Sequence, residues 1–345
     1  MPGLSYRGRA ILAAIIEEFI ATGEPVGSRT AAKKAHLELS PATVRNVMAE
    51  LEEQGLLAQP HTSAGRVPTE EGLRYFVGSL LKPYEPTQAD LDRLRRQCEA
   101  AAGDPEELMR RAVRTLSLLG QAAGLVTSPR IEALPLVSLR FIPVRERTLL
   151  AVLVTAGGLV HQRAIQVPRQ LERGELERIH NYLNDLLVGR SLAELRELID
   201  LEARDARASM DQLRQKALDL GSQAIEDARS PELYVEGHEN LFGNAEFTDS
   251  DRLRAAIRAL AEKDQLLELL DRTIAAEGIH VLIGTESGIE SLSGLTVITA
   301  RYGDGDSPAG TLGLIGPSRM DYAKAMSLVD HTAKLVSLLL QKRSS

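Results

Sequence analysis

Apolar residues recur through the N-terminal part of the chain with the spacing of short amphipathic helices. Between Arg9 and Ile20 they occur as pairs every four positions, which predicts a first helix with a broad buried face. Residues 23–27 contain two glycines and a proline and break this pattern. A short second helix is expected over residues 29–35, capped by the hydroxyl of Ser28.

A third helix is bounded by clear start and stop signals. Ser40 supplies an oxygen for the N-cap, Pro41 suits the first helical position, and Gly55 favours the left-handed conformation that ends a helix. One face is expected to pack on a small core through Val44, Val47, Met48 and Leu51. The opposite face carries Ala42, Asn46, Ala49 and Glu53, with Thr43 and Arg45 beside them.

Residues 56–68 carry the signals of a two-stranded hairpin. A short apolar strand over 56–59 is followed by turn-forming residues at 63–66 and by a returning strand over 66–68. Thr69 is expected to cap a fourth helix that runs to about Leu81. Two prolines within residues 82–86 then predict a linker.

Beyond the linker the pattern alternates between helical and strand periods. Helices are predicted over 87–101, 105–119, 171–188 and 319–342. Strands are predicted at 136–143, 148–155 and 159–167, with a turn at Gly157 and Gly158, and again at 279–283, 295–301 and 310–315. A helical block over 192–275 separates the two groups. Strands on both sides of a long helical segment predict one sheet domain that carries an insertion.

Heptad spacing within the helical block predicts a seam for another helix. Small and apolar residues follow one another at steps of three and four: Ala203, Ala206, Met210, Leu213, Ala217, Leu220 and Ala224. Such a stripe fits dimerisation through a coiled coil. It fits packing within one subunit equally well, because a stripe does not say whose helix it faces.

The leading surface of the third helix has the composition that DNA reading requires. A helix enters the major groove only if its exposed N-terminal side is slim, and Asn, Arg, Ser and Thr suit base edges. Ala42, Thr43, Arg45 and Asn46 meet both conditions. With the elements around it, this helix predicts a winged helix-turn-helix, although an ordinary amphipathic surface helix shows the same periodicity.

The predicted DNA contacts divide by role. Thr43, Arg45 and Asn46 are expected to read base edges in the major groove. Phosphates are expected to contact Ser28, Arg29, Lys33 and Ser40, and the hairpin is expected to bind backbone or minor groove through Arg66 with His61, Thr62 and Ser63. For His61, a hydrogen-bonded position in the turn is an equal alternative.

Length and charge add a constraint on this hypothesis. A chain of 345 residues predicts two or three domains. The net charge is −7, whereas residues 1–82 carry nine Lys or Arg and nine Asp or Glu and are therefore neutral. Such a domain neutralises few phosphates, so its nonspecific affinity for DNA is expected to be modest. Two copies on one operator would offset that weakness, which makes homodimerisation a requirement.

Other functions find little support in the sequence. Cys98 is the single cysteine and has no histidine nearby, so neither a disulfide nor a reactive thiol is expected. The histidines show no metal-ligand spacing, and no Ser-His-Asp order accompanies a nucleophile turn, so we expect no metal site, no cofactor and no catalysis. Neither a signal peptide nor a run of about 18 apolar residues occurs, which predicts a cytoplasmic protein without a membrane span.

Two further patterns near the C-terminus are ambiguous by themselves. Asp304 and Asp306 offer two carboxylates without further regularly spaced oxygen ligands, and we interpret them as part of a solvated hairpin rather than a cation loop. Gly310, Gly313 and Gly316 are spaced by three. This spacing fits backbone turns or close packing better than dinucleotide binding.

Several segments, in the same order along the chain, resemble the family of heat-inducible transcription repressors called HrcA. They are Gly23-Glu-Pro-Val-Gly-Ser-Arg29, residues 40–52, Pro60-His-Thr-Ser-Ala-Gly-Arg66, Gly72-Leu-Arg-Tyr-Phe76, Ile283-Gly-Thr-Glu286 and Gly313-Leu-Ile-Gly-Pro-Ser-Arg-Met-Asp-Tyr322. The resemblance implies an α+β multidomain protein with an N-terminal winged helix-turn-helix domain, a GAF-like sheet domain and an inserted helical or α+β dimerisation domain.

The resemblance also suggests where these domains lie. We expect the DNA-binding domain at 1–82, a linker and connecting helix at 83–104, the GAF-like domain in two segments at 105–199 and 271–345, and the inserted dimerisation domain at 200–270. Residues 232–247, with Tyr234, Val235 and Phe242, are expected to supply short strands to that insertion.

The function implied by the resemblance is repression of heat-shock (chaperone) operons. A homodimer would occupy an inverted-repeat operator in double-stranded DNA, and the chaperonin GroEL would modulate its activity. An alternative is a one-component regulator whose GAF-like domain binds a small-molecule effector. A third possibility is an interaction module that binds no DNA.

Overall fold

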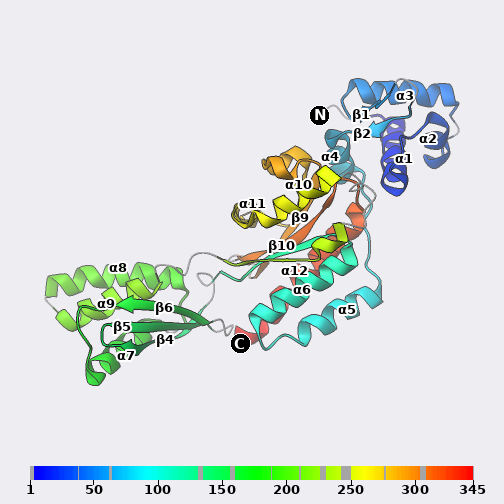
Figure 1. Cartoon of the computed structure of the whole chain (residues 1–345). Helices are drawn as coiled ribbons and strands as arrows, with labels where there is room; N and C mark the ends of the chain where they lie inside the picture. Colours follow the sequence, from blue (N-terminus) through cyan, green and yellow to red (C-terminus); the bar gives the residue numbers. More distant parts are fainter. Residues whose placement is uncertain are drawn as a thin grey trace.

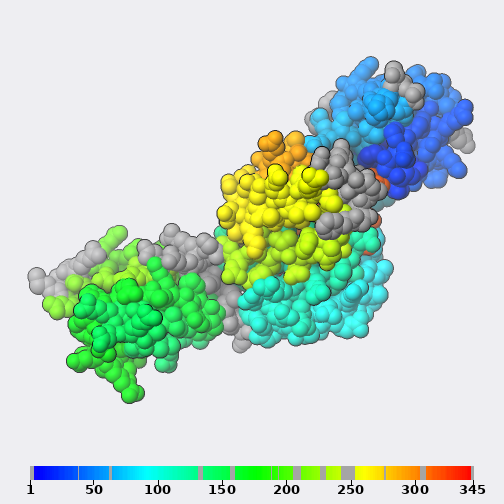
Figure 2. Space-filling model, viewed as in Figure 1, coloured from blue at the N-terminus to red at the C-terminus, as the bar shows by residue number. Residues whose placement is uncertain are grey.

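The computed structural model shows an elongated chain of three bodies in a row (Figure 1; Figure 2). It describes residues 4–37, 39–61, 64–130, 135–155, 160–187, 189–209, 211–225, 231–241, 250–275, 277–303 and 308–344. An N-terminal head, residues 4–80, lies at one end, and a central body holds a five-stranded sheet. An insert with a three-stranded sheet lies at the other end.

The head contains the predicted helices and hairpin in the predicted order. Its elements are α1 (Tyr6–Thr22), α2 (Ser28–Lys34), α3 (Pro41–Glu53), β1 (Leu57–Ala58), β2 (Val67–Pro68) and α4 (Glu70–Ser79). The two strands pair antiparallel, with Leu57 opposite Pro68. One expectation was wrong. The N-cap of α2 is Gly27, which offers no side-chain oxygen, and Ser28 is the first helical residue.

A five-stranded antiparallel sheet forms the centre of the molecule. Its strands run in the order β7 (Leu233–Glu236), β3 (Ala123–Thr127), β10 (Pro308–Pro317), β9 (Leu295–Gly303) and β8 (Ile279–Ile283). The helices α6 (Pro105–Gly120) and α12 (Tyr322–Ser344) cover one face, and α5 (Gln88–Glu99) packs on both of them. The opposite face is covered by α10 (Ser250–Ala261) and α11 (Lys263–Ile274). Short 3-10 turns are η2 (His238–Leu241), η4 (Gly284–Ser287) and η5 (Glu290–Leu292).

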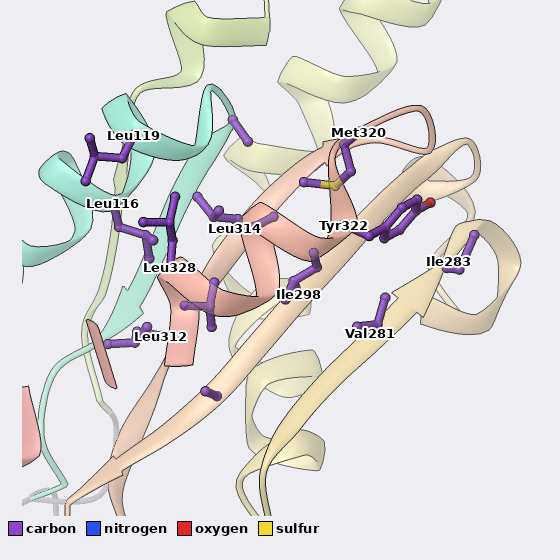
Figure 3. Close-up of a cluster of buried hydrophobic side chains, with 14 of the residues drawn as sticks. Leu116, Leu119, Val281, Ile283, Ile298, Leu312, Leu314, Met320, Tyr322 and Leu328 are labelled. Carbon is purple, nitrogen blue, oxygen red and sulfur yellow. The ribbon is translucent and has the colours of Figure 1, made fainter. Parts of the chain in front are cut away.

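Alternating side chains of the sheet supply two separate apolar cores. Ile298 and Leu314 point toward α6 and α12, where Leu116 and Leu328 meet them (Figure 3). The other face packs against α11 through residues such as Val297. The first of these clusters also includes the core residues of the head, so the apolar interior is continuous between head and central body.

The insert has a sheet and a core of its own. Its strands β4 (Leu136–Arg145), β5 (Thr148–Thr155) and β6 (Val160–Gln166) form an antiparallel meander. The helices α7 (Arg173–Leu187), α8 (Leu192–Ser209) and α9 (Gln212–Ile225) complete it, and α7 and α9 contact the sheet directly. The chain leaves the central sheet at Thr127 and returns at Leu233, which pair with each other across β3 and β7. The insert is therefore connected to the central sheet at the ends of two neighbouring strands.

The grouping of strands differs from the sequence-based expectation. The strands near 136–167 and those near 279–315 were expected to share one sheet, and that expectation is wrong, because they form two sheets. Tyr234 and Val235 were assigned to the insert but belong to β7 of the central sheet, while Phe242 lies outside the described residues. The boundary expected at residue 200 falls inside α8, and α10 and α11 pack on the central sheet. Hydrophobic periodicity identifies a strand but not its partner.

The heptad stripe does not form one continuous helix. It runs across α8 and α9, which are separate helices that pack on each other, and the second begins after Asp211, whose carboxylate accepts the N–H of Arg214. Ala217, Leu220 and Ala224 are buried in the core of the insert itself, and Ala203 and Leu213 are partly buried against it. Met210 lies outside the described residues, as does the side chain of Ala206. The five described residues of the stripe thus pack within the insert, as the intramolecular alternative predicts.

Two glycines of α4 offer a test of how tightly this helix is seated. A Cβ on Gly72 would lie 2.0 Å from the backbone oxygen of Leu56, whereas a Cβ on Gly78 would meet nothing within 4 Å. We expect Gly72→Ala to lower the free energy of unfolding by about 1–3 kcal/mol through overpacking. Gly78→Ala, the control, should be neutral or stabilise by up to about 1 kcal/mol. Denaturant unfolding measures both, and equal stability of the two variants would contradict this packing.

Candidate nucleic-acid interface

The N-terminal end of α3 is fixed by its own side chains. The hydroxyl oxygen of Ser40 accepts the N–H of Thr43 at 3.1 Å, and the two hydroxyls lie 2.9 Å apart. Pro41 occupies the first turn, as predicted. At the other end Gly55 has φ +76°, a left-handed conformation that favours glycine. The helix therefore begins and ends where the sequence signals predicted.

The side chains of α3 divide into the two predicted faces. Val44, Met48 and Leu51 are buried in the core of the head. On the other side Arg45 and Asn46 are exposed and Thr43 is half-buried. The amphipathic division is confirmed, and the slim exposed end carries one guanidinium and one amide that can each make paired hydrogen bonds to a base edge. Base reading by these side chains stays a prediction.

The phosphate-contact candidates lie on two helices that pack together. α2 contacts α3 and presents Arg29 and Lys33 as exposed cations, while Ser28 is half-buried. Ser40 is exposed at the start of α3 although its oxygen already accepts a cap hydrogen bond. The neighbouring Lys34 binds Glu18 of α1 at 3.0 Å, so its charge is partly compensated within the head.

The hairpin candidates are only partly brought to the surface. His61 is exposed, and Thr62 and Ser63 lie outside the described residues. Arg66 differs from expectation because its side chain is only 17% exposed and pairs with Glu52 of α3 at 2.7 Å. Its backbone N–H and C=O also exchange hydrogen bonds of 2.9 Å with Val26. In this structure Arg66 is therefore a tie between the hairpin and α3 rather than an exposed cation.

Other chemistry is sparse in the described part of the chain. No group of three or more His, Cys, Asp or Glu side chains is placed to hold a metal ion there. Burial raises the pKa of the Cys98 thiol to about 12, so at neutral pH it stays protonated and a poor nucleophile. None of the described helices is both long and apolar enough to cross a membrane.

The glycines near the C-terminus serve packing. Gly310 and Gly313 lie within β10, where a Cβ on Gly313 would come 2.1 Å from the carbonyl oxygen of Ile298 on the neighbouring strand. A Cβ on Gly310 would come 2.4 Å from the hydroxyl of Tyr302. Close packing, which the sequence favoured over dinucleotide binding, accounts for both. Residues 304–307, with the aspartate pair, lie outside the described residues.

A capped helix with a slim polar end, held on a small helical core and followed by a hairpin, is the arrangement found in DNA-binding transcription regulators. Comparison with known proteins narrows this class. The chain belongs to the heat-inducible transcription repressor HrcA family. The family's C-terminal domain profile matches residues 106–326.

Relatives of known name match this chain along nearly its whole length. The heat-inducible transcription repressor HrcA of Sorangium cellulosum is 47% identical over 339 residues, which cover 96% of this chain and 97% of the relative. That of Geobacter sulfurreducens is 42% identical and covers 99% of both chains. A crystal structure described only as a hypothetical protein is 28% identical, with a TM-score of 0.63, and covers 99% of this chain and all of its own.

The cap of α3 allows stability and DNA contact to be separated. Ser40→Ala removes the cap acceptor and should cost about 0.5–2 kcal/mol of stability. Ser40→Asp keeps an acceptor and places a negative charge at a helix N-terminus, so its free energy of unfolding should be close to that of wild type. If this end of α3 faces phosphate, the same charge should weaken operator binding in a gel shift.

A matched control lies at another helix. Thr87 caps α5 through the N–H of Asp90 at 3.2 Å, far along the chain from α3. Thr87→Ala should lower stability by a similar amount and leave operator affinity unchanged once the folded fraction is accounted for. Undiminished operator binding by Ser40→Asp would contradict the placement of α3 against DNA.

Proposed function

We propose that this chain represses heat-shock (chaperone) operons as a homodimer that occupies an inverted-repeat operator. Its family membership makes it a DNA-binding transcription repressor rather than an enzyme. The head acts as a winged helix-turn-helix, and the central body corresponds to the GAF-like domain. The observation that carries the proposal is the exposed leading end of α3, with Arg45 and Asn46 outward and Val44 and Met48 buried.

In this proposal α3 lies in the major groove. Arg45 can pair with two acceptors of guanine and Asn46 with the donor and acceptor of adenine, while Thr43 contacts a base edge or methyl group. The phosphates beside the groove contact Arg29, Lys33, Ser28 and Ser40, and the hairpin tip from His61 to Ser63 touches the backbone or minor groove. Arg66 contributes indirectly, because it holds the hairpin against α3 through Glu52.

Two copies are needed because one head binds weakly. The nine basic residues of positions 1–82 are balanced by nine acidic ones, and the phosphate contribution to affinity grows with the number of neutralised phosphates. Linking two heads converts the second contact into an intramolecular event with a high effective concentration. A dimer on a symmetric operator therefore gains affinity that the sequence of the head does not provide.

The outer face of the insert's sheet is a candidate surface for the second copy. The inner face packs on α7 and α9, whereas Ile142 on β4 is 49% exposed on the other side. Register places Ile142, Leu150 and Ala164 in one row across this face and Val154 opposite Val160 in another, with Arg140, Val152 and Gln162 in the row between them. Exposed apolar side chains with polar neighbours are typical of protein interfaces. We assign dimerisation to it in place of the heptad stripe.

Two features of the proposal rest on family resemblance alone. The chaperonin GroEL keeps or restores the active form of the repressor, and unfolded protein relieves repression by competing for the chaperonin. Such a protein works in the cytoplasm, where its operators lie. Both follow from the resemblance described above.

Footprinting of the purified protein on chaperone-operon DNA, with and without GroEL, tests the function. Two symmetric protected half-sites are expected. Arg45→Ala and Asn46→Ala should each weaken operator binding roughly 5- to 150-fold, because each paired base contact is worth about 1–3 kcal/mol. Both side chains are exposed, so stability should change little.

Glu53→Ala, at the far end of the same helix, is the control and should not reduce affinity. If no DNA is protected either with or without GroEL, the repressor proposal is wrong. Protection that survives both Arg45→Ala and Asn46→Ala would leave repression intact but contradict the assignment of α3 as the reading helix.

The dimer surface has its own test. Ile142→Arg places a charge in the apolar row and should weaken self-association roughly 10-fold or more, measured by sedimentation at several concentrations. Glu197→Arg introduces the same side chain at an exposed position of α8, which belongs to the helical layer, and should leave association unchanged. Equal self-association of the two variants would place the dimer contact elsewhere.

A further inference from the structure

Two segments that match the HrcA family lie far from α3 in sequence and take no part in DNA reading as proposed. One is Ile283-Gly-Thr-Glu286 at the end of β8, and the other leads from β10 into α12 and contains Arg319. In the structure both touch the head. Their side chains meet α4 and the end of α1, which are the parts of the head that adjoin the central body (Figure 1).

Arg74 of α4 makes the most extensive of these contacts. Its Nε donates to Glu286 Oε1 at 2.7 Å, and its Nη2 donates to the carbonyl oxygen of Val281 and pairs with the second carboxylate oxygen. That second oxygen also accepts the backbone N–H of Ile283 at 2.8 Å. A fork of donors on a carboxylate that is itself held by the backbone constrains direction as well as distance.

Glu70, one turn earlier on α4, binds the neighbouring residue. Its Oε2 accepts the hydroxyl of Thr285 at 2.7 Å and the backbone N–H of Thr285 at 3.2 Å. Gly284 makes this approach possible, because a Cβ there would lie 1.8 Å from the Glu70 carboxylate, and its φ of +55° also favours glycine. We call Glu70, Arg74, Thr285 and Glu286 the latch.

A second point of contact lies at the end of α1. Arg319 Nη1 donates to the carbonyl oxygen of Ile20 at 3.1 Å, and the guanidinium carbon lies 3.1 Å from where a Cβ on Gly23 would stand. A cation at the C-terminal end of a helix is favourably placed with respect to the helix dipole. One contact point would leave the head free to pivot, whereas two points on different helices restrict it.

The chain connection alone would not fix the head. Residues 81–87 join α4 to α5 without helix or strand. Val281, Ile283, Met320 and Tyr322 of the central body belong to the same buried apolar cluster as the core of the head. Such burial adds adhesion but little angular preference, because it is non-directional. The directional part of the joint is the polar contact made by the latch and by Arg319.

We propose that the latch residues are positioning residues that set the angle of each head on its central body, and thereby the spacing of half-sites that a dimer accepts. This proposal rests on the proposed function, because it assumes two heads on one DNA. A base-pair step turns one half-site by roughly 34–36° about the DNA axis. Heads held at a fixed angle can therefore engage both half-sites only at particular spacings.

The test compares a latch variant with a matched surface variant. Glu70→Ala combined with Arg74→Ala removes the α4 side of the latch and leaves every proposed DNA contact in place. The control is Glu268→Ala combined with Arg272→Ala, an exposed ion pair of 2.8 Å within α11. Binding is measured on DNA with one half-site and on two half-sites whose separation varies in single base pairs over one helical turn.

Wild type and control should lose much of a roughly 100-fold avidity gain when the spacing is wrong. The latch variant should bind all spacings within a few-fold of each other and keep wild-type affinity for a single half-site. A merely structural role would instead lower affinity for both kinds of DNA together. Spacing discrimination that persists in the latch variant, or its absence in wild type, overturns the proposal.

A second measurement needs no DNA. Cysteines introduced at the exposed positions Glu53 and Gln265 accept spin labels selectively, because Cys98 is fully buried. With labelled protein diluted in unlabelled protein, the distance distribution should be narrow in wild type and control and broad in the latch variant. If the distance distribution of the latch variant is as narrow as that of wild type, the latch does not fix the angle of the head. If wild type binds no paired half-sites, the proposed function fails, and the distance measurement still decides whether the latch holds the head.

Discussion

The continuous apolar cluster between the head and the central body is the contact on which the rest of the structure depends. It joins the interior of α1, α3 and α4 to the face of the central sheet that α6 and α12 cover. Without it, the head would be attached to the body by residues 81–87 and by a few polar contacts. Because apolar burial supplies adhesion without direction, the polar contacts around Arg74 and Arg319 can set an angle at small energetic cost. Adhesion and orientation are thus supplied by different residues.

The position of the insert follows from a different constraint. The chain leaves and re-enters the central sheet at Thr127 and Leu233, which face each other on adjacent strands, so a separate body can be added there without breaking the sheet. Its own core makes the insert largely independent of the central body. Head and insert then lie at opposite ends of the molecule (Figure 2). If the insert's sheet carries the dimer contact, the central body is the spacer that relates dimer geometry to the two heads.

Helix ends and helix faces of this chain were predictable from sequence. Strand partners and contacts between residues far apart in the sequence were not. The ends and faces of α3 depend on Ser40, Gly55 and a 3.6-residue period, which are local, and they were predicted correctly. β3 was missed because all five of its residues are buried and show no alternation, directly after an apolar helix. The heptad stripe was ambiguous from the start, since spacing does not identify a partner. The latch could not be predicted because Arg74 and Glu286 are each ordinary surface residues until folding brings them together.

Ion pairs within the protein reduce the number of basic residues that the neutral head can offer to DNA. Of the nine basic residues at positions 1–82, Lys34, Arg66 and Arg74 pair with Glu18, Glu52 and Glu286, so three of nine cations serve the fold. Of the other six, Arg45 is proposed to contact a base edge and only Arg29 and Lys33 are proposed to contact phosphate, so the nonspecific affinity, which rises with each neutralised phosphate, is low. A weak head spends little time on random DNA, and it binds firmly only where two heads engage together. Discrimination between operator and genome then depends on the angle between heads as much as on base contacts, and a repressor of this design is sensitive to any change that loosens the joint.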